Sequence, residues 1–184
     1  TAAITGNYSV VNALTNTDNN DQITITVNDV ISIANVNTLD AKTGADLVLT
    51  GGVSDQAVNY SDIAGNASAG LTALGLQDDN VTLTVTTAVN MLQMADLNAA
   101  TSVNVVLTGG VSDAAINLVS TDGNTETAEF TAATTQDADV AVVITGGDAA
   151  TAAQISAVAN ATTGAVTAAI TGNYSVVNAL TNTD

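Results

Sequence analysis

The chain repeats itself internally, and this repetition limits the folds that it can adopt. The segment ITITVNDVISIANVNTLDAKTGADLVLTGGVSDQAVNYSDIAGN begins at Ile23, and it aligns without a gap with VTLTVTTAVNMLQMADLNAATSVNVVLTGGVSDAAINLVSTDGN, which begins at Val81. A looser third copy begins at Val140. Recurrence over such lengths is typical of stacked architectures, in which each repeat packs only against its neighbours.

A longer period encloses these units. The stretch TAAITGNYSVVNALTNTD occupies residues 1–18 and again residues 167–184, which sets a period of 166 residues. The glycines of the recurring Thr-Gly-Gly or Thr-Gly-Asn motif divide this period into three related units, of about residues 7–51, 52–109 and 110–172. The match predicts that residues 1–184 are one window of a tandem array.

Each unit has the pattern of a strand, a helix and a second strand. Ile23, Ile25 and Val27 alternate with threonines, as in a strand with one buried face. Helix faces are predicted from a spacing of three in two aligned sets, Ile33, Val36 and Leu39, and Met91, Met94 and Leu97. A strand, a crossover helix and a strand pair in parallel. The predicted fold class is therefore α/β, a repetitive β-solenoid with parallel strands and short crossover helices.

The expected parallel strands lie near residues 23–28, 46–50, 81–87, 103–108, 140–145 and 166–171. Residues 57–66 and 114–124 are expected to hold a further short strand in each unit, and residues 67–77 a helix. If the duplicated ends mark an array, Ile4 and Ile170 should occupy equivalent core positions. The two copies should then adopt the same strand, turn and helix.

The charge balance excludes several partners. Eighteen acidic residues face a single cation, Lys42, and the formal net charge is −17. Such a surface repels phosphate, which argues against nucleic-acid binding and against attraction to anionic lipid. No run of about 18 apolar residues predicts insertion into a membrane. Cations and further copies of the chain are the expected partners.

The composition and the repeat style resemble a known class of protein. Units rich in Asp, Asn, Gly, Thr and Ala, a helix of the type TAAQISAVANATTG followed by VTAAITG, and the near-absence of Lys and Arg are similar to the repeat regions of giant secreted surface proteins of marine bacteria, notably cyanobacteria. The resemblance implies an extracellular or cell-surface location. Those proteins often carry hemolysin-type calcium-binding repeats, but the Gly-Gly-x-Gly-x-Asp nonapeptide is missing from this chain, so no ligand can be transferred.

Calcium is instead argued from the acidic turns, because clustered carboxylates, amide oxygens and carbonyls are the ligands that Ca²⁺ prefers. The candidate metal ligands are Asp18, Asp21, Asp78, Asp79, Asp122, Asp137 and Asp139. The alternative is that Asp and Asn, there and in the two GGVSD motifs, simply cap helices and form turns. Both interpretations remain open at this stage.

The residue inventory favours a structural role over catalysis. The chain has no His, Cys or Arg, so the usual nucleophile–base pairs and cationic clamps lack their parts, and we do not expect an enzyme. A structural repeat of an extracellular filament, sheath, fibre or adhesin is the first interpretation. The alternative is a surface-binding module such as an ice-binding solenoid, because Thr24, Thr26, Thr82 and Thr84 give two Thr-x-Thr strands. Ala141 and Val143 interrupt that pattern in the third unit.

Overall fold

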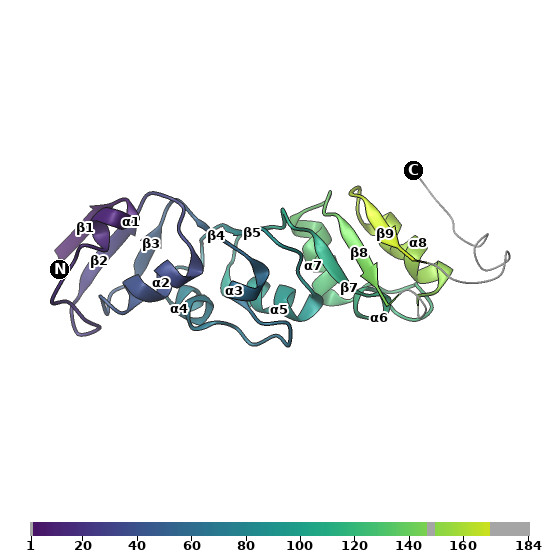
Figure 1. Cartoon of the computed structure of the whole chain (residues 1–184), viewed down its shortest axis with the longest axis horizontal. Coiled ribbons are helices and arrows are strands. Elements are labelled where there is room, and N and C mark those ends of the chain that lie inside the picture. Colours follow the sequence, from purple (N-terminus) through teal and green to yellow (C-terminus); the bar gives the residue numbers. More distant parts are fainter. Residues whose placement is uncertain (1, 147–149, 170–184) are drawn as a thin grey trace.

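Three parallel sheets of three strands each follow one another along an elongated molecule (Figure 1). The computed structural model describes residues 2–146 and 150–169 of the 184-residue chain. The first sheet lies near the N-terminus and the third near the other end, so the order of the sheets along the long axis follows the order of the chain.

The three sheets belong to three successive groups of elements. The first contains β1 (Ala2–Gly6), α1 (Tyr8–Val11), β2 (Ile23–Val27), α2 (Ile33–Asp40) and β3 (Leu47–Leu49). The second contains β4 (Val53–Asp55), α3 (Ala57–Tyr60), α4 (Ala69–Gln77), β5 (Leu83–Val85), α5 (Met91–Ala100) and β6 (Val105–Val106). The third contains β7 (Val111–Ala114), α6 (Ala115–Leu118), α7 (Ala128–Gln136), β8 (Val142–Thr145), α8 (Ala152–Ala161) and β9 (Val166–Ala168).

Every pair of neighbouring strands in these sheets runs parallel. Ile4 lies opposite Ile25 in the first sheet, and Leu83 lies between Val53 and Val105 in the second. Between paired strands the chain leaves the sheet, passes through helical or irregular segments and returns in the same direction. The predicted parallel pairing is therefore confirmed.

One sheet ends and the next begins where two short strands follow each other closely in the chain but pair with different neighbours. β3 pairs with the preceding strand β2, whereas β4, which starts only four residues after β3 ends, pairs with the following strand β5. Gly51 and Gly52 join them. Gly52 has a φ of +80°, and a Cβ on Gly51 would lie 2.2 Å from the backbone of Asp29. Gly109 and Gly110 join β6 to β7 in the same way, so these two Gly-Gly pairs mark the steps from one sheet to the next.

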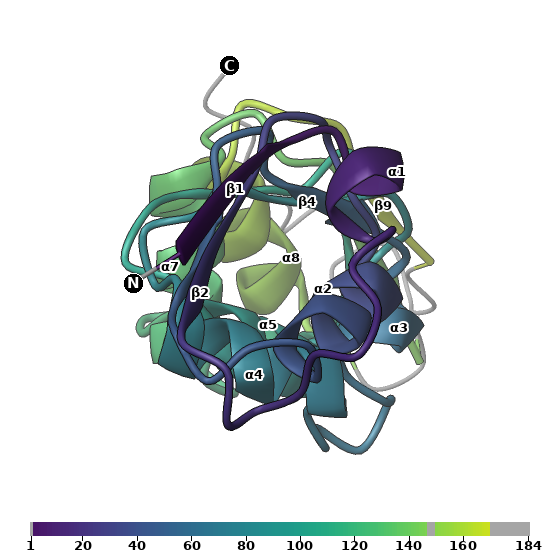
Figure 2. The same ribbon diagram turned by 90° about the vertical axis from the view of Figure 1, so that its left-hand side faces the viewer.

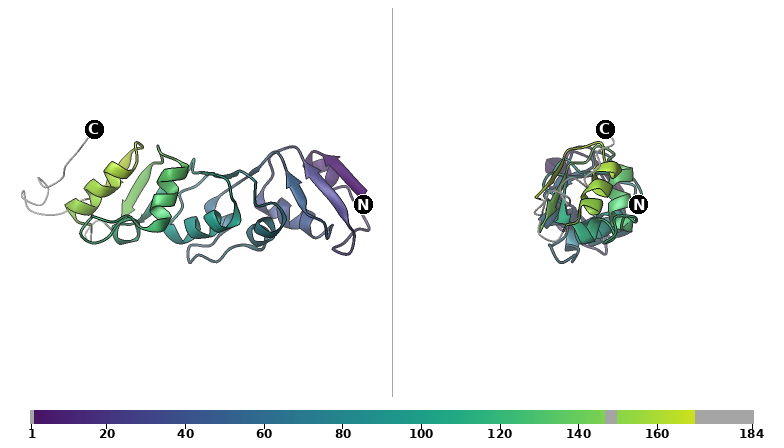
Figure 3. Two further views of the ribbon diagram at one scale, coloured as in Figure 1. Left: turned by 180° about the vertical axis from the view of Figure 1, so that it is seen from behind. Right: turned by 90° about the vertical axis from the view of Figure 1, so that its right-hand side faces the viewer.

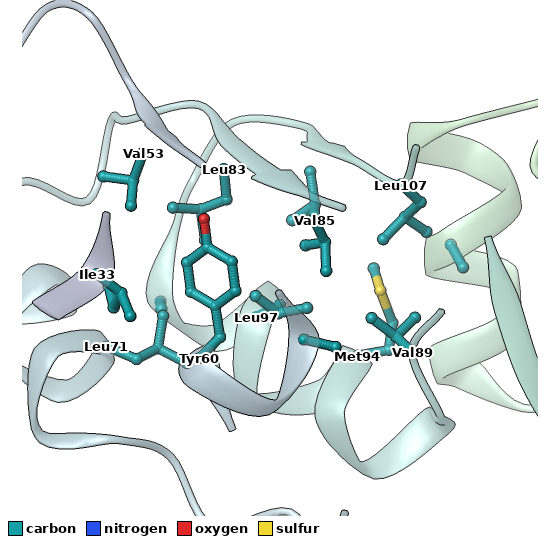
Figure 4. Close-up of a cluster of buried hydrophobic side chains, with 14 of the residues drawn as sticks. Ile33, Val53, Tyr60, Leu71, Leu83, Val85, Val89, Met94, Leu97 and Leu107 are labelled. Carbon is teal, nitrogen blue, oxygen red and sulfur yellow. The ribbon is translucent and has the colours of Figure 1, made fainter. Parts of the chain in front are cut away.

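The core runs through the whole length of the described chain. Viewed along the long axis, strands and helices surround a common interior (Figures 2 and 3). The interior is filled mainly by aliphatic side chains, and among the described residues Tyr60 and Phe130 are aromatic side chains with 0% exposure. In Figure 4 the Tyr60 ring projects from α3 toward Leu83, and its hydroxyl donates to the carbonyl of Thr84 at 3.1 Å. Burial is the main cause that raises the pKa of Tyr60.

Most of the expected elements are confirmed. The strands expected near 23–28, 46–50, 81–87, 103–108 and 140–145 contain β2, β3, β5, β6 and β8, and the helix expected at 67–77 is α4. The two predicted helix faces are buried along α2 and α5. The last expected strand, 166–171, contains β9, but its final two residues lie outside the described residues.

One expectation is wrong. Residues 57–66 and 114–124 do not hold the further strand expected there. The first range begins with the short helix α3, and the second begins with the short helix α6, after the last residue of β7. The only strand-like contacts of these ranges are isolated bridges at Ser61 and Val119. Ala57 and Tyr60 face the core one helical turn apart, as do Ala115 and Leu118. Two inward residues at that spacing favour a single helical turn over an extended chain.

Ile170 lies outside the described residues, as does the rest of the second copy from residue 170 on, so the expected equivalence with Ile4 and with the first copy stays a prediction. Ile4 itself is partly buried and packs against the core from β1.

Candidate functional site

The first pair of candidate calcium ligands lies in the exposed loop before β2. The Asp18 carboxylate accepts a hydrogen bond from the amide of Asn20 at 2.8 Å, and the Asp21 carboxylate accepts one from the amide of Asp18 at 2.9 Å. Hydrogen bonds of this type are those of an Asx turn. The two carboxylates are therefore already engaged in shaping their own loop.

Asp78 and Asp137 occupy equivalent places at the ends of α4 and α7. Asp78 accepts from the amide of Leu49 in β3 at 2.8 Å, and Asp137 accepts from the amide of Leu107, just after β6, at 3.2 Å. Each carboxylate thus accepts an amide at the end of the last strand of the preceding sheet. This role belongs to the fold and needs no metal.

Asp139 lies beside Asp137 and shares a hydrogen bond with it. Partial burial, with the hydrogen bond to Asp139 and then its charge as further causes, raises the pKa of Asp137. The corresponding turn of the second unit contains Asp78, Asp79 and Asn80. The side-chain amide of Asn80 therefore takes the place of the Asp139 carboxylate. Asp79 contributes its backbone carbonyl, which accepts from the hydroxyls of Thr101 and Ser102.

Asp122 belongs to a tight turn with Gly123. Its carboxylate accepts from the Ser120 hydroxyl at 2.6 Å and from the amide of Asn124 at 3.1 Å, and these bonds lower the pKa of Asp122. Asp62 makes a similar turn in the second unit, in which Asn66 is the main cause that lowers its pKa. The carboxylate in each turn takes the place of a backbone acceptor.

The seven candidate residues are thus divided among several turns. Within residues 2–146 and 150–169, no three His, Cys, Asp or Glu side chains come together as a metal site would require. Asp137 and Asp139 form one pair, and Asp18 and Asp21 another. Calcium binding by these residues stays a prediction.

The GGVSD motifs place two further carboxylates at helix starts. Asp55, in β4, accepts from the amide of Ile33 at the start of α2 at 3.1 Å, and Asp113, in β7, accepts from the amide of Met91 at the start of α5 at 2.8 Å. A negative charge at a helix N-terminus is favourable because the free amides carry a partial positive charge. Each motif therefore links a strand to the helix of the preceding segment.

A recurring threonine, which we call the threonine staple, was not predicted. Thr43, Thr101 and Thr162 are buried at the ends of three crossovers, and their hydroxyls lie 2.7 Å from the carbonyls of Ile23, Val81 and Val140. Each hydroxyl also accepts an amide two residues further along the chain. Threonine at this aligned position was the available sequence signal, but abundant threonine elsewhere in the chain hid it.

Lys42, the residue before Thr43, adds a further link in the first group of elements. Its Nζ donates to the carbonyl of Leu14 at 2.8 Å, which ties the loop after α1 to the end of α2. The link bridges 28 residues of sequence.

The outward faces of the sheets carry mixed rows. Thr5, Thr26 and Val48 lie side by side across the first sheet, and Ser54, Thr84 and Val106 lie side by side across the second. Each hydroxyl row therefore ends at a valine in the third strand. Thr24 lies opposite Ala3, and Thr82 precedes β5.

Two shallow grooves repeat between the helices. One is lined by Asp55, Val58 and Asn59 near α2 and α4, and the other by Asp113, Ile116 and Asn117 near α5. The lining residues are equivalent at a spacing of 58. In both grooves the asparagine donates to the aspartate, so the polar groups are paired with one another.

Comparisons with protein-family models, curated proteins and solved structures give no significant match. None of the described helices is long and apolar enough to cross a membrane.

Proposed function

We propose that the chain is a structural repeat of an extracellular filament, sheath, fibre or adhesin at the cell surface. The single observation that carries the proposal is the identity of residues 1–18 and 167–184. A sequence that recurs without change after a full set of three sheets is suited to extending a rod by further copies. The elongated shape in Figure 1 supports the same function, because length is what a stalk or fibre has to supply.

We further propose that the fold is a β-solenoid. Strand, helix and parallel strand recur along the chain, and carboxylates and hydroxyls bridge each segment to the next. The threonine staples are the clearest of these bridges. Such a stack gains stability from interfaces between neighbours, so that adding copies adds length without requiring a new core.

The experiment is electron microscopy of the native cell surface with gold-labelled antibodies raised against this chain. The expected result is label along thin extracellular filaments or a surface layer. Label confined to the cell interior would overturn the proposal. An antibody preparation preabsorbed with the purified chain serves as the control.

Ice binding remains the second candidate because hydroxyl rows do face outward on the sheets. Thr5 and Thr26 are neighbours across β1 and β2, which is the favourable observation. The interruption of the rows by Val48 and Val106 is unfavourable. Measurement of thermal hysteresis on the purified chain decides this candidate, and the rod proposal expects none.

A further inference from the structure

We propose that β9 and β1 are two halves of one strand, and that the preceding period of a tandem array covers the free edge of β1. The partner of this edge is therefore another copy of the same sequence. This inference rests on the proposed function and adds to it the geometry of the joint between periods.

The register of β9 and β1 is that of a single strand. Ala168 in β9 lies opposite Ile144, and Ala2 in β1 lies opposite Ile23. Residues 167–184 repeat residues 1–18, so Ala168 and Ala2 are the same position of the period. The same position of the period therefore pairs with the preceding strand, β8, as Ala168, and with the following strand, β2, as Ala2. A strand that does both joins the third sheet to the first sheet of the next period.

The length of chain after Gly6 also favours a shared strand. From Gly51 to the start of α3 at Ala57 the chain has room for β4, and from Gly109 to the start of α6 at Ala115 it has room for β7. Gly6 is followed almost at once by α1, which starts at Tyr8. No separate forward-pairing strand fits there. The strand before Gly6 has to pair forward itself, as β1 does with β2.

The surroundings of the glycines support the shared strand independently of the strand pairing. A Cβ on Gly51 would lie 2.2 Å from the Asp29 backbone, and a Cβ on Gly109 would lie 2.1 Å from the Thr87 backbone. Both glycines are therefore required by the segment that precedes them. The atoms nearest to a Cβ on Gly6 would be those of the exposed Val10 side chain of α1, at 3.2 Å. A glycine in the same motif is explained if a preceding segment packs against it in the array.

The joint predicts an alternation of sheets. In each period, the Gly51-Gly52 and Gly109-Gly110 steps separate one sheet from the next. In the proposed array, the Thr-Gly-Asn motif at the joint between periods does not separate sheets. The array should therefore alternate a five-stranded sheet, formed by β7, β8, the shared strand, β2 and β3, with the three-stranded sheet β4–β5–β6. Hydrogen bonding across the joint makes the rod continuous from period to period.

The test uses a two-period chain, in which residues 1–184 are followed by residues 19–184 of a second copy. Hydrogen exchange is compared between residues 2–6, at the free edge, and residues 168–172, at the joint, which have the same sequence. Alternate amides of an edge strand face away from its partner and lack acceptors there. We expect exchange at the joint to be slower by roughly 100-fold at those amides.

Matched glycine variants supply a second readout. In the two-period chain, Gly172→Ala should lower the unfolding midpoint as much as Gly109→Ala does, whereas Gly6→Ala should leave it nearly unchanged. Equal exchange at the two sites, together with a neutral Gly172→Ala, would overturn the shared strand. That outcome would still permit a filament of flexibly joined periods, so it is distinguishable from a failure of the cell-surface labelling experiment.

Discussion

At the scale of single residues, one hydroxyl satisfies the backbone where a crossover returns to its strand. Thr101 caps the end of α5, is 7% exposed, and joins Val81 to Val103 through its side chain. A methyl group in its place would fill the same space but would neither donate nor accept. The buried carbonyl and amide would then lose their partners.

We therefore expect Thr101→Val to lower the free energy of unfolding by about 1–3 kcal/mol, the usual cost of unsatisfied buried polar groups. Urea denaturation followed by circular dichroism measures the change. Thr82→Val is the matched control, because Thr82 is exposed, and a change within about 0.5 kcal/mol is expected there. Equal losses in the two variants would refute a specific role for the threonine staple.

At the scale of elements, the sequence predicts strands whose apolar residues alternate and helices whose apolar residues recur at helical spacing. It does not predict elements that form only through contact with a distant segment. β2 and α5 were predictable because their inward residues repeat along one segment. β4 was not, because only one of its three residues, Val53, is apolar and buried, and the segment becomes a strand by pairing with β5. The roles of Asp78 and Asp137 were missed for the same reason. Their hydrogen-bond partners lie about 30 residues away in the chain.

The turn at the end of α7 gives an element-scale prediction. Asp139→Asn should lower the pKa of Asp137, because an amide can donate to that carboxylate whereas Asp139 raises its pKa. The part due to burial should remain. Carboxyl carbon NMR titration measures the change, and Asn80 provides the natural precedent in the second unit. An unchanged pKa of Asp137 would show that burial alone is responsible.

The sign of the accompanying effect on stability follows from the raised pKa. A carboxyl that holds its proton more tightly in the folded state stabilises that state below its ordinary pKa of 3.8, and this contribution is lost as the pH rises through the raised pKa. Asp139→Asn should therefore reduce the loss of stability over that interval. Asp62 and Asp122, whose pKa values are lowered, contribute in the opposite sense, and their contribution is lost as the pH falls.

At the scale of the whole molecule, a net charge of −17 has to be accommodated along one rod. Repulsion between the acidic turns opposes folding, and cations in the surrounding water reduce it. Calcium is the proposed counter-ion, with Asp18, Asp21, Asp78, Asp79, Asp122, Asp137 and Asp139 as the proposed ligands.

If calcium binds only the folded chain, a concentration of 100 times Kd should stabilise it by about 2.7 kcal/mol. Thermal unfolding is measured in Ca²⁺, in chelator, and in Mg²⁺ at equal ionic strength, which controls for simple screening. The expected order of midpoints places Ca²⁺ above Mg²⁺. Equal midpoints in Ca²⁺ and chelator would leave the acidic surface with a role in hydration alone.

The scarcity of cationic side chains affects how proteases can cleave the chain. Proteases that cleave after lysine or arginine find a single such residue in the chain, Lys42. Its ammonium group donates to the carbonyl of Leu14, so the loop after α1 is tied to the end of α2 at this point. A rod of these repeats would thus offer trypsin-like enzymes one cleavage point per 166 residues, in a structured part of the chain. Digestion by such enzymes would release whole periods rather than short peptides.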